Sequence, residues 1–161
     1  MKQASEEQTQ TQGLRVEKIK LTTTHNGEDL TFLYPAYGPY IYASVKELIE
    51  QDNLKPATMA ETVSLVHAAF NSDDQYSNEI KDIMKKRWLW AFTGTLVTPR
   101  GEYIQDNPET REGMPFMEES ELVKKLESND PSVRLVPFNY KTGEMTSLEL
   151  VKNPYVIALT G

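Results

Sequence analysis

The sequence contains no cysteine, and this absence limits its chemistry. Without thiols the chain cannot form disulfides, zinc–thiolate sites or iron–sulfur clusters, and thiol catalysis is excluded. No apolar run approaches the roughly 20 residues that a transmembrane helix needs. The polar N-terminal residues also lack the apolar stretch of a signal peptide. These absences favour a cytoplasmic protein with no membrane partner, although a chain without cysteine is compatible with other compartments.

Clustered glycines are absent as well, because the eight glycines lie singly along the chain. A loop that cradles phosphate needs several glycines close together, so no nucleotide site and no cofactor is predicted. There is no Gly-x-Ser-x-Gly motif typical of a nucleophile elbow. The 24 acidic residues exceed the 17 basic ones and give a net charge of -7. This charge argues against a broad nucleic-acid surface, which would need a basic excess.

What is present is typical of a globular chain: 161 residues, of which 39% are hydrophobic. Residues 1–12 are polar, and we expect them to form a disordered tail. Residues 13–161 are expected to form a single domain. The apolar run Tyr155–Leu159 predicts a final buried strand. Because this run lies so close to Gly161, the alternative that the chain is cut from a longer protein stays open.

The first third of the chain has the pattern of antiparallel strands. Asn26-Gly27 between the strand-like segments Leu14–Thr24 and Leu30–Tyr34 is a strong hairpin signal, since both turn residues tolerate positive φ. Tyr40–Tyr42 is predicted to form a third short strand.

Three Ser/Thr-x-x-Glu capping boxes predict helix starts, at Ser44–Glu47, Thr58–Glu61 and Thr146–Glu149. The second opens the clearest helix, whose predicted buried stripe consists of Met59, Val63, Val66 and Phe70. A further helix is expected after a cap at Ser77 or Asn78.

The alternation in Trp88–Thr98 predicts a central strand with both faces covered and both tryptophans in the core. A turn at Pro99 leads to a more polar strand, Glu102–Asp106, followed by a polar loop at Pro108–Pro115. Met117–Glu127 is predicted to be a helix and Val133–Phe138 a strand. Together these elements predict an α+β fold, with helices packed on an antiparallel or mixed sheet of about five to seven strands.

Four tyrosines gather within nine residues around two prolines and a glycine: Tyr34, Tyr37, Tyr40 and Tyr42. Tyrosine combines a large apolar face with a hydroxyl, which suits a binding surface. We expect at least two of the four to form an exposed contact surface. The alternative is that they pack inward and hold the turn together.

Carboxylates are the other candidates for chemistry. Glu102 and Asp106 share one face of a predicted strand, with α-carbons roughly 13 Å apart from the strand rise. Asp106 and Glu109 flank Asn107-Pro108. Two interpretations of this segment stay open: an oxygen-ligated Mg²⁺ or Ca²⁺ site, or an Asx turn without a metal. His67 is a general base or a histidine at the edge of the core. No helical histidine pair exists, so no metal ligand set is assigned.

Two functions therefore stay open. One is a non-enzymatic binding module that uses the tyrosine segment to recognise a protein or small-ligand partner. The other is a carboxylate-dependent enzyme of the hydrolase type, which would use Glu102, Asp106 and Glu109 with His67 in support. The sequence does not decide the oligomeric state.

Overall fold

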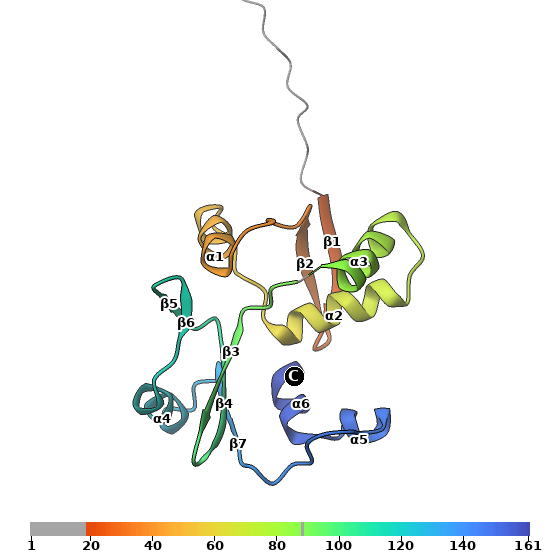
Figure 1. Cartoon of the computed structure of the whole chain (residues 1–161). Coiled ribbons are helices and arrows are strands. Elements are labelled where there is room, and N and C mark those ends of the chain that lie inside the picture. Colours follow the sequence, from red (N-terminus) through yellow and green to blue (C-terminus); the bar gives the residue numbers. More distant parts are fainter. Residues whose placement is uncertain (1–18, 88) are drawn as a thin grey trace, which may run out of the picture.

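A computed structural model describes residues 19–87 and 89–161 (Figure 1). Within this part the chain forms helices and antiparallel strands, which confirms the α+β class. The strands are divided among three small sheets rather than joined in one, with the orders β1-β2, β3-β4-β7 and β5-β6. The strands are β1 (Ile19–His25), β2 (Glu28–Tyr34), β3 (Thr93–Thr98), β4 (Gly101–Asp106), β5 (Glu109–Arg111), β6 (Met114–Phe116) and β7 (Val133–Val136). The helices are α1 (Tyr42–Gln51), α2 (Met59–Phe70), α3 (Gln75–Lys86), α4 (Glu119–Glu127), α5 (Ser147–Val151) and α6 (Pro154–Thr160).

The N-terminal hairpin is confirmed. β1 and β2 pair antiparallel from Ile19↔Tyr34 to His25↔Glu28. The turn residues Asn26 and Gly27 have φ values of 51° and 83°, as this tight turn requires. Residues 14–18 of the predicted first strand lie outside the described residues. The predicted third strand is wrong, because Tyr40 and Ile41 are irregular and Tyr42 begins α1.

Two of the predicted helix starts are confirmed, and in both the capping box is complete. Thr58 with Glu61, and Thr146 with Glu149, form reciprocal capping boxes at α2 and α5. The box at Ser44 is wrong, since α1 already begins at Tyr42 and its N-cap, Ile41, makes no side-chain cap. The predicted cap of α3 is also wrong, because Asp74 holds that position and accepts from Ser77 N–H at 3.0 Å.

The predicted buried stripe of α2 is wrong in part. Val63 and Phe70 are exposed, whereas Thr62 and Ala69 are buried. α2 packs against α3, α6 and β1. Small side chains let these neighbours approach closely, as at Ala60, whose Cβ lies beside Gly161 at the end of α6. The face of the helix that becomes buried therefore depends on three neighbours that periodicity alone does not identify.

The three-stranded sheet is the centre of the lower half of the molecule (Figure 1). β4 is its middle strand and its most buried one, with Tyr103 and Ile104 fully inaccessible. β3 is an edge strand that begins only at Thr93, and Trp90 is 47% exposed. The prediction of a central strand with Trp90 in the core is therefore wrong. Trp88 lies outside the described residues.

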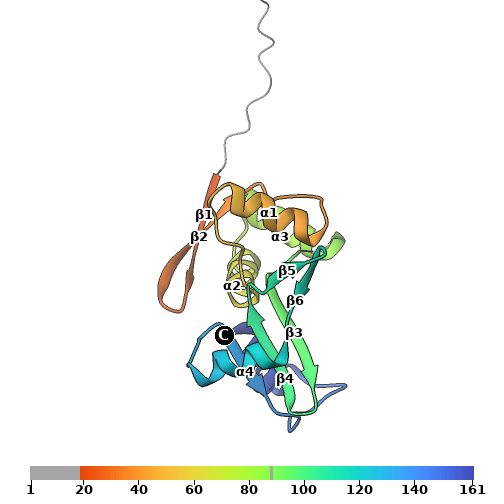
Figure 2. The ribbon, with the colours of Figure 1, turned by 90° about the vertical axis from the view of Figure 1, so that its left-hand side faces the viewer.

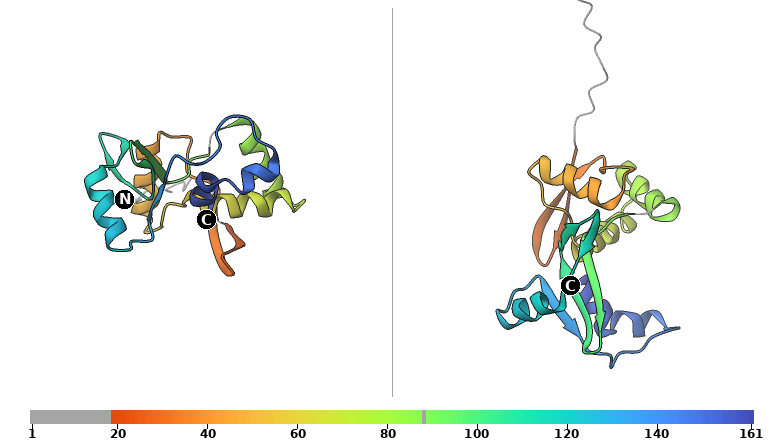
Figure 3. Two further views of the ribbon diagram at one scale, coloured as in Figure 1. Left: turned by 90° about the horizontal axis from the view of Figure 1, so that it is seen from below. Right: turned by 60° about the vertical axis from the view of Figure 1, so that its left-hand side comes forward.

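Helices cover both faces of this sheet (Figures 2 and 3). Tyr103 and Val133 form one core cluster with Leu122 of α4. Ile104 and Arg134 belong to the opposite face, because side chains alternate along a strand. There the Arg134 Nε donates to the Ala158 carbonyl of α6 at 2.9 Å. Residues four apart on β4, such as Glu102 and Asp106, therefore share the face that α6 covers.

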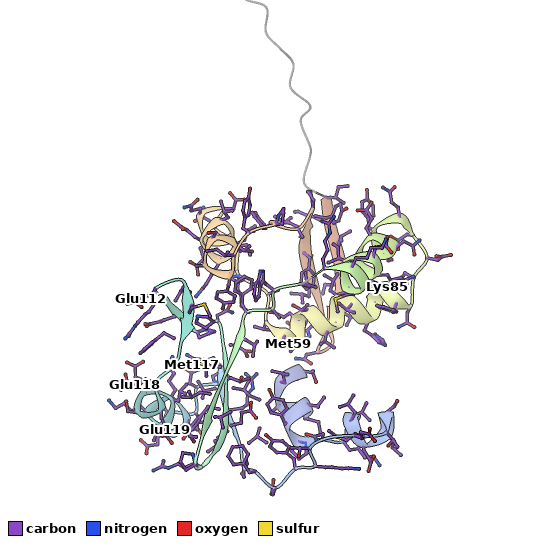
Figure 4. All side chains as sticks on the ribbon, viewed as in Figure 1. Met59, Lys85, Glu112, Met117, Glu118 and Glu119 are labelled. Carbon is purple, nitrogen blue, oxygen red and sulfur yellow. The ribbon has the colours of Figure 1, made fainter. Side chains whose placement is uncertain are left out.

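Two further predictions are corrected by local geometry. The predicted polar loop at Pro108–Pro115 contains the β5-β6 hairpin, whose tip, Glu112-Gly113, takes positive φ at both residues (Figure 4). The predicted strand Tyr155–Leu159 is helix α6. Asn153 accepts a hydrogen bond from Tyr155 N–H at 3.0 Å, and Pro154 occupies the first helical position. The dipeptide Asn153-Pro154 thus starts a helix here.

The capping box of α2 should make stability depend on pH. Burial tends to raise the pKa of Glu61, but hydrogen bonds from the Thr58 N–H and the Lys55 ammonium outweigh it and hold this pKa below the ordinary 4.5. A carboxyl whose pKa is lower in the folded state than in the unfolded state stabilises the fold at pH values above its unfolded-state pKa. This stabilisation is lost as the pH falls through the folded-state pKa. We expect Glu61→Gln to lower the free energy of unfolding at pH 7 by about 1 kcal/mol.

The measurement is urea denaturation from pH 7 down to the acid range. The difference between the wild type and Glu61→Gln should shrink as the pH falls below 4.5. Thr58→Ser keeps the capping hydroxyl and should behave as the wild type. A difference that stays constant with pH would contradict the assignment.

Candidate functional site

The four tyrosines of the 34–42 segment occupy different environments. Tyr34 packs edge-to-face against Tyr76 of α3, with ring centroids 5.3 Å apart. The Tyr37 hydroxyl donates to the Asp52 carboxylate at the end of α1. Tyr42 is 8% exposed and packs with Val45 and Phe92, so it lies beneath the surface. Of the four, Tyr34, Tyr37 and Tyr42 hold the segment against the fold.

Tyr40 is the member that faces solvent, with 58% of its surface exposed. Its neighbours on the surface are Ile41, 69% exposed, and Trp90 from the segment before β3. The indole N–H of Trp90 donates to the Tyr40 carbonyl at 3.4 Å, so two segments 50 residues apart meet here. We call Tyr40, Ile41 and Trp90 the Tyr40 patch.

The base of the Tyr40 patch is well packed. The Trp90 ring stands edge-to-face on Tyr42, with centroids 5.7 Å apart and planes at 85°. Tyr42 in turn contacts the Phe92 ring at 4.9 Å, and the Phe92 N–H donates to the Ala57 carbonyl at 2.8 Å. Burial and the Glu50 carboxylate raise the pKa of the Tyr42 hydroxyl, which therefore stays neutral. The exposed side chains thus rest on an ordered, uncharged support.

An acidic groove begins beside the Tyr40 patch, between α1 and β5. Its volume is about 470 Å³, and its lining consists of Ala43, Lys46, Glu47, Glu50, Glu109 and Thr110. The Lys46 ammonium is buried, donates to the Pro108 carbonyl at 2.7 Å and lies 3.9 Å from Glu50. The lining thus carries three carboxylates and one ammonium, and Arg111, which is outside the lining, pairs with one of the carboxylates, Glu109. This imbalance favours a positively charged group in the groove.

The candidate carboxylates are not brought together. Glu102 accepts from the Tyr140 hydroxyl at 2.8 Å, and this contact raises the pKa of Tyr140. Glu109 lies 3.4 Å from Arg111 on the β5-β6 hairpin. Asp106 belongs to a separate ion pair on the sheet. Among residues 19–87 and 89–161 no group of three histidine, aspartate or glutamate side chains is placed to hold a metal ion.

Asp106 connects three strands and two helices. It accepts from Arg134 at 2.5 Å and from the Thr93 hydroxyl at 2.8 Å. The Thr93 oxygen accepts the N–H of Met59, which lies at the start of α2 beside β3 (Figure 4). Arg134 continues to the Ala158 carbonyl of α6. Each of these donors and acceptors already has a partner, so the arrangement is that of a structural link.

Both histidines form side-chain hydrogen bonds with neighbouring residues. His67 is exposed on α2 and lies 3.2 Å from the Asn71 side chain. His25 Nδ1 lies 2.9 Å from the Ser64 hydroxyl, a contact that the sequence did not reveal. Its Nε2 lies 3.2 Å from the Asn26 amide nitrogen, so both ring nitrogens have a hydrogen-bonding partner. The contact with Ser64 fastens the β1-β2 hairpin to α2.

Comparison with known proteins gives no assignment. No protein-family model, no curated protein sequence and no solved structure matches this chain. In the described part of the chain no helix is both long and apolar enough to cross a membrane.

Sequence reasoning identified Tyr40 but missed its two partners. Ile41 falls in a predicted strand and Trp90 in the predicted core, because apolar residues are usually buried. The signal that was available is the density of tyrosine and proline before α1. The contribution of Trp90 arises only when the segment before β3 passes α1, and no local pattern encodes that approach.

Proposed function

We propose that this protein is a non-enzymatic binding module, which recognises a partner protein through the Tyr40 patch. The observation that supports this proposal is the exposure of Tyr40, Ile41 and Trp90 at one place on the surface. Tryptophan and tyrosine are enriched among the residues that contribute most to binding energy. Each can bury a large ring while its polar atom keeps a hydrogen bond.

The support beneath the patch favours this use. Because Trp90 rests on Tyr42, and Tyr42 in turn packs on Phe92, the Trp90 ring loses little freedom when a partner arrives. A preformed surface binds more tightly than a mobile one with the same contacts, since less order is created on association. Tyr34 and Tyr37 contribute indirectly, because they hold the residues before Tyr40 against α3 and the end of α1.

The acidic groove narrows the chemistry of the partner. It starts at Ala43, two residues after Ile41, and carries Glu47, Glu50 and Glu109. A partner segment with an apolar anchor for the patch and lysine or arginine beside it would match both surfaces. Complementary charge accelerates association and is screened by salt. Affinity should therefore fall as the salt concentration rises.

The test compares surface variants that keep the fold. Wild type, Tyr40→Ala, Ile41→Ala and a control, Phe70→Ala, are immobilised, and captured proteins are quantified by mass spectrometry. Phe70 is exposed on α2 and does not belong to the Tyr40 patch. A partner retained by wild type and Phe70→Ala is then purified and titrated. Truncation of an anchor typically costs about 2 kcal/mol or more, so Tyr40→Ala should weaken binding roughly thirtyfold.

The same titration tests the groove. Glu47→Gln with Glu50→Gln should weaken binding at low salt and much less at high salt, where the charges are already screened. Thermal melting of every variant establishes that the fold is retained. If all variants capture the same proteins in the same amounts as wild type, the Tyr40 patch is not the binding site and the proposal fails.

A further inference from the structure

The edge of strand β3 offers a second surface, independent of the Tyr40 patch. β4 is bonded to β7 through Asp106, whose N–H donates to the Ser132 carbonyl at 2.9 Å. Since directions alternate along a strand, Gly101, Tyr103 and Gln105 bond to β3. Their β3 partners are Thr98, Leu96 and Gly94. The N–H and C=O groups of Thr95 and Val97 therefore point to the free edge.

This edge is open in the described part of the chain. Among residues 19–87 and 89–161, no backbone hydrogen bond other than those of the β3-β4 ladder reaches Thr95 or Val97. Both residues are exposed, Val97 to 67%. The start of β3 is different, because the Thr93 side chain is held by Met59 and Asp106. The available edge is the segment from Thr95 to Val97.

β3 also lacks the features that protect strand edges. Natural edge strands commonly carry charged residues, prolines or bulges, which prevent pairing with another chain. Every other edge strand described has such a residue: Lys20 in β1, Glu28 and Asp29 in β2, Glu109 in β5, Pro115 in β6 and Arg134 in β7. The β3 sequence Thr-Gly-Thr-Leu-Val-Thr has neither a charge nor a proline. Its edge is thus suited to pairing.

We propose that β3 pairs antiparallel with β3 of a second copy of this chain across a two-fold axis. In this register Thr95 lies opposite Val97 of the second copy, and Val97 lies opposite Thr95. Each such pair exchanges both of its N–H···O=C bonds. The two-fold axis passes through Leu96, so the same edge supplies both sides of an isologous contact.

The side chains and the charge favour a second copy as the occupant. Leu96 packs at the margin of the Tyr103–Leu122 cluster, and on the axis it would meet Leu96 of the second copy. Val97 would cover Thr95 of the second copy on the opposite face, which buries its exposed side chain. Two chains that each carry a charge of -7 repel one another. An uncharged edge is where they can approach closely, and screening by salt should strengthen the pairing.

The contact is smaller than a standard interface, so we expect a weak dimer that forms at high concentration. Sedimentation equilibrium over a wide range of protein concentrations gives the mass. Amide hydrogen exchange, followed by NMR at low and high concentration, locates the contact. The amides of Thr95 and Val97 should exchange rapidly when dilute and become protected when concentrated. Those of Leu96 and Thr98 should be protected throughout, because β4 already binds them.

Two variants remove the contact in different ways. Val97→Pro deletes the outward N–H, which edge strands tolerate, and Val97→Lys introduces the charge that protects natural edges. Both should shift the dissociation constant at least tenfold towards monomer. Leu148→Lys, at a residue 64% exposed on α5, is the matched control and should dimerise as the wild type does.

The proposal is overturned if the wild type is monomeric at every concentration. It is also overturned by a dimer in which the Thr95 and Val97 amides stay unprotected, or by unchanged dimerisation of Val97→Lys. A dimer that Tyr40→Ala abolishes and Val97→Lys leaves intact would move the interface to the Tyr40 patch and reject pairing through β3.

Discussion

Among glycine-to-alanine substitutions at the described glycines, Gly101→Ala is expected to destabilise the protein most. Gly101 begins β4 with φ at 144°, a conformation that residues with a side chain rarely adopt. A Cβ atom there would lie 2.4 Å from the Val136 carbonyl oxygen and 3.1 Å from the Pro137 Cα. Both contacts are with backbone, so no side-chain rotation can relieve them.

The strand β7 would have to move. Val136 pairs with Glu102, the residue next to Gly101, so displacement of its carbonyl breaks the end of the β4–β7 ladder. Strain at positive φ and overpacking each cost about 1–3 kcal/mol. We therefore expect Gly101→Ala to lower the free energy of unfolding by about 3–5 kcal/mol, measured by urea denaturation.

Gly143→Ala separates the two causes. Gly143 also has a positive φ, 84°, but a Cβ there would meet nothing within 4 Å. This variant should show only the conformational strain, about 1–2 kcal/mol. Equal effects of the two substitutions would mean that the approach of β7 to Gly101 contributes nothing.

The features predicted from sequence are those that a few adjacent residues determine. Asn26-Gly27 sets its own turn, because both residues accept positive φ whatever surrounds them. The capping boxes of α2 and α5 are complete within four residues, and each glutamate bonds the N-cap residue three positions earlier. Such motifs need no distant partner, and so a single sequence reveals them.

The predictions that failed concern burial and long apolar runs. Trp88–Thr98 does alternate, but alternation does not say whether a neighbouring strand lies on both sides, and β3 is an edge strand. Tyr155–Leu159 is a continuous apolar run, and periodicity cannot separate helix from strand in such a run. Asn153 and Pro154 supplied the helix start for this run, but the same dipeptide also ends elements. Val63 is exposed because α3, α6 and β1 cover a different face of α2, and this choice is made by contacts far apart in sequence.

The candidate site divides in the same way. The tyrosine segment can be recognised in the sequence because its composition is local, but only Tyr40 of its four tyrosines is exposed, fewer than the two expected. Trp90 lies beside Tyr40 only because the fold brings the segment before β3 next to it. The carboxylates were predicted to share a face, and Glu102 and Asp106 belong to the same face of β4. Their partners, Tyr140 and Arg134, come from later segments, and spacing along one strand cannot reveal them.

Asp106→Asn is expected to give the largest loss of stability after Gly101→Ala among the substitutions proposed for this protein. The substitution keeps the size of the side chain but removes the charge that faces Arg134. Removing one partner of a buried ion pair costs about 3–5 kcal/mol, because the other charge is left without compensation. Here roughly a quarter of each side chain is exposed, which lets water replace part of the interaction. We therefore expect a loss of about 2–3 kcal/mol in urea denaturation.

A double-mutant cycle with Arg134→Met isolates the pair. Because both residues belong to one network, the sum of the stability losses of the two single variants should exceed the stability loss of the double variant. Asp82→Asn is the matched control, since Asp82 pairs with Lys86 at 2.9 Å on the exposed face of α3. That pair is open to solvent, and its loss should be far smaller.

The outcome also bears on a catalytic role for Asp106. A residue that joins β3, β4, β7, α2 and α6 through Thr93 and Arg134 should matter for folding before it matters for any reaction. Stability retained in Asp106→Asn, with losses that simply add in the cycle, would contradict the structural role. Such a result would favour a catalytic role for this carboxylate.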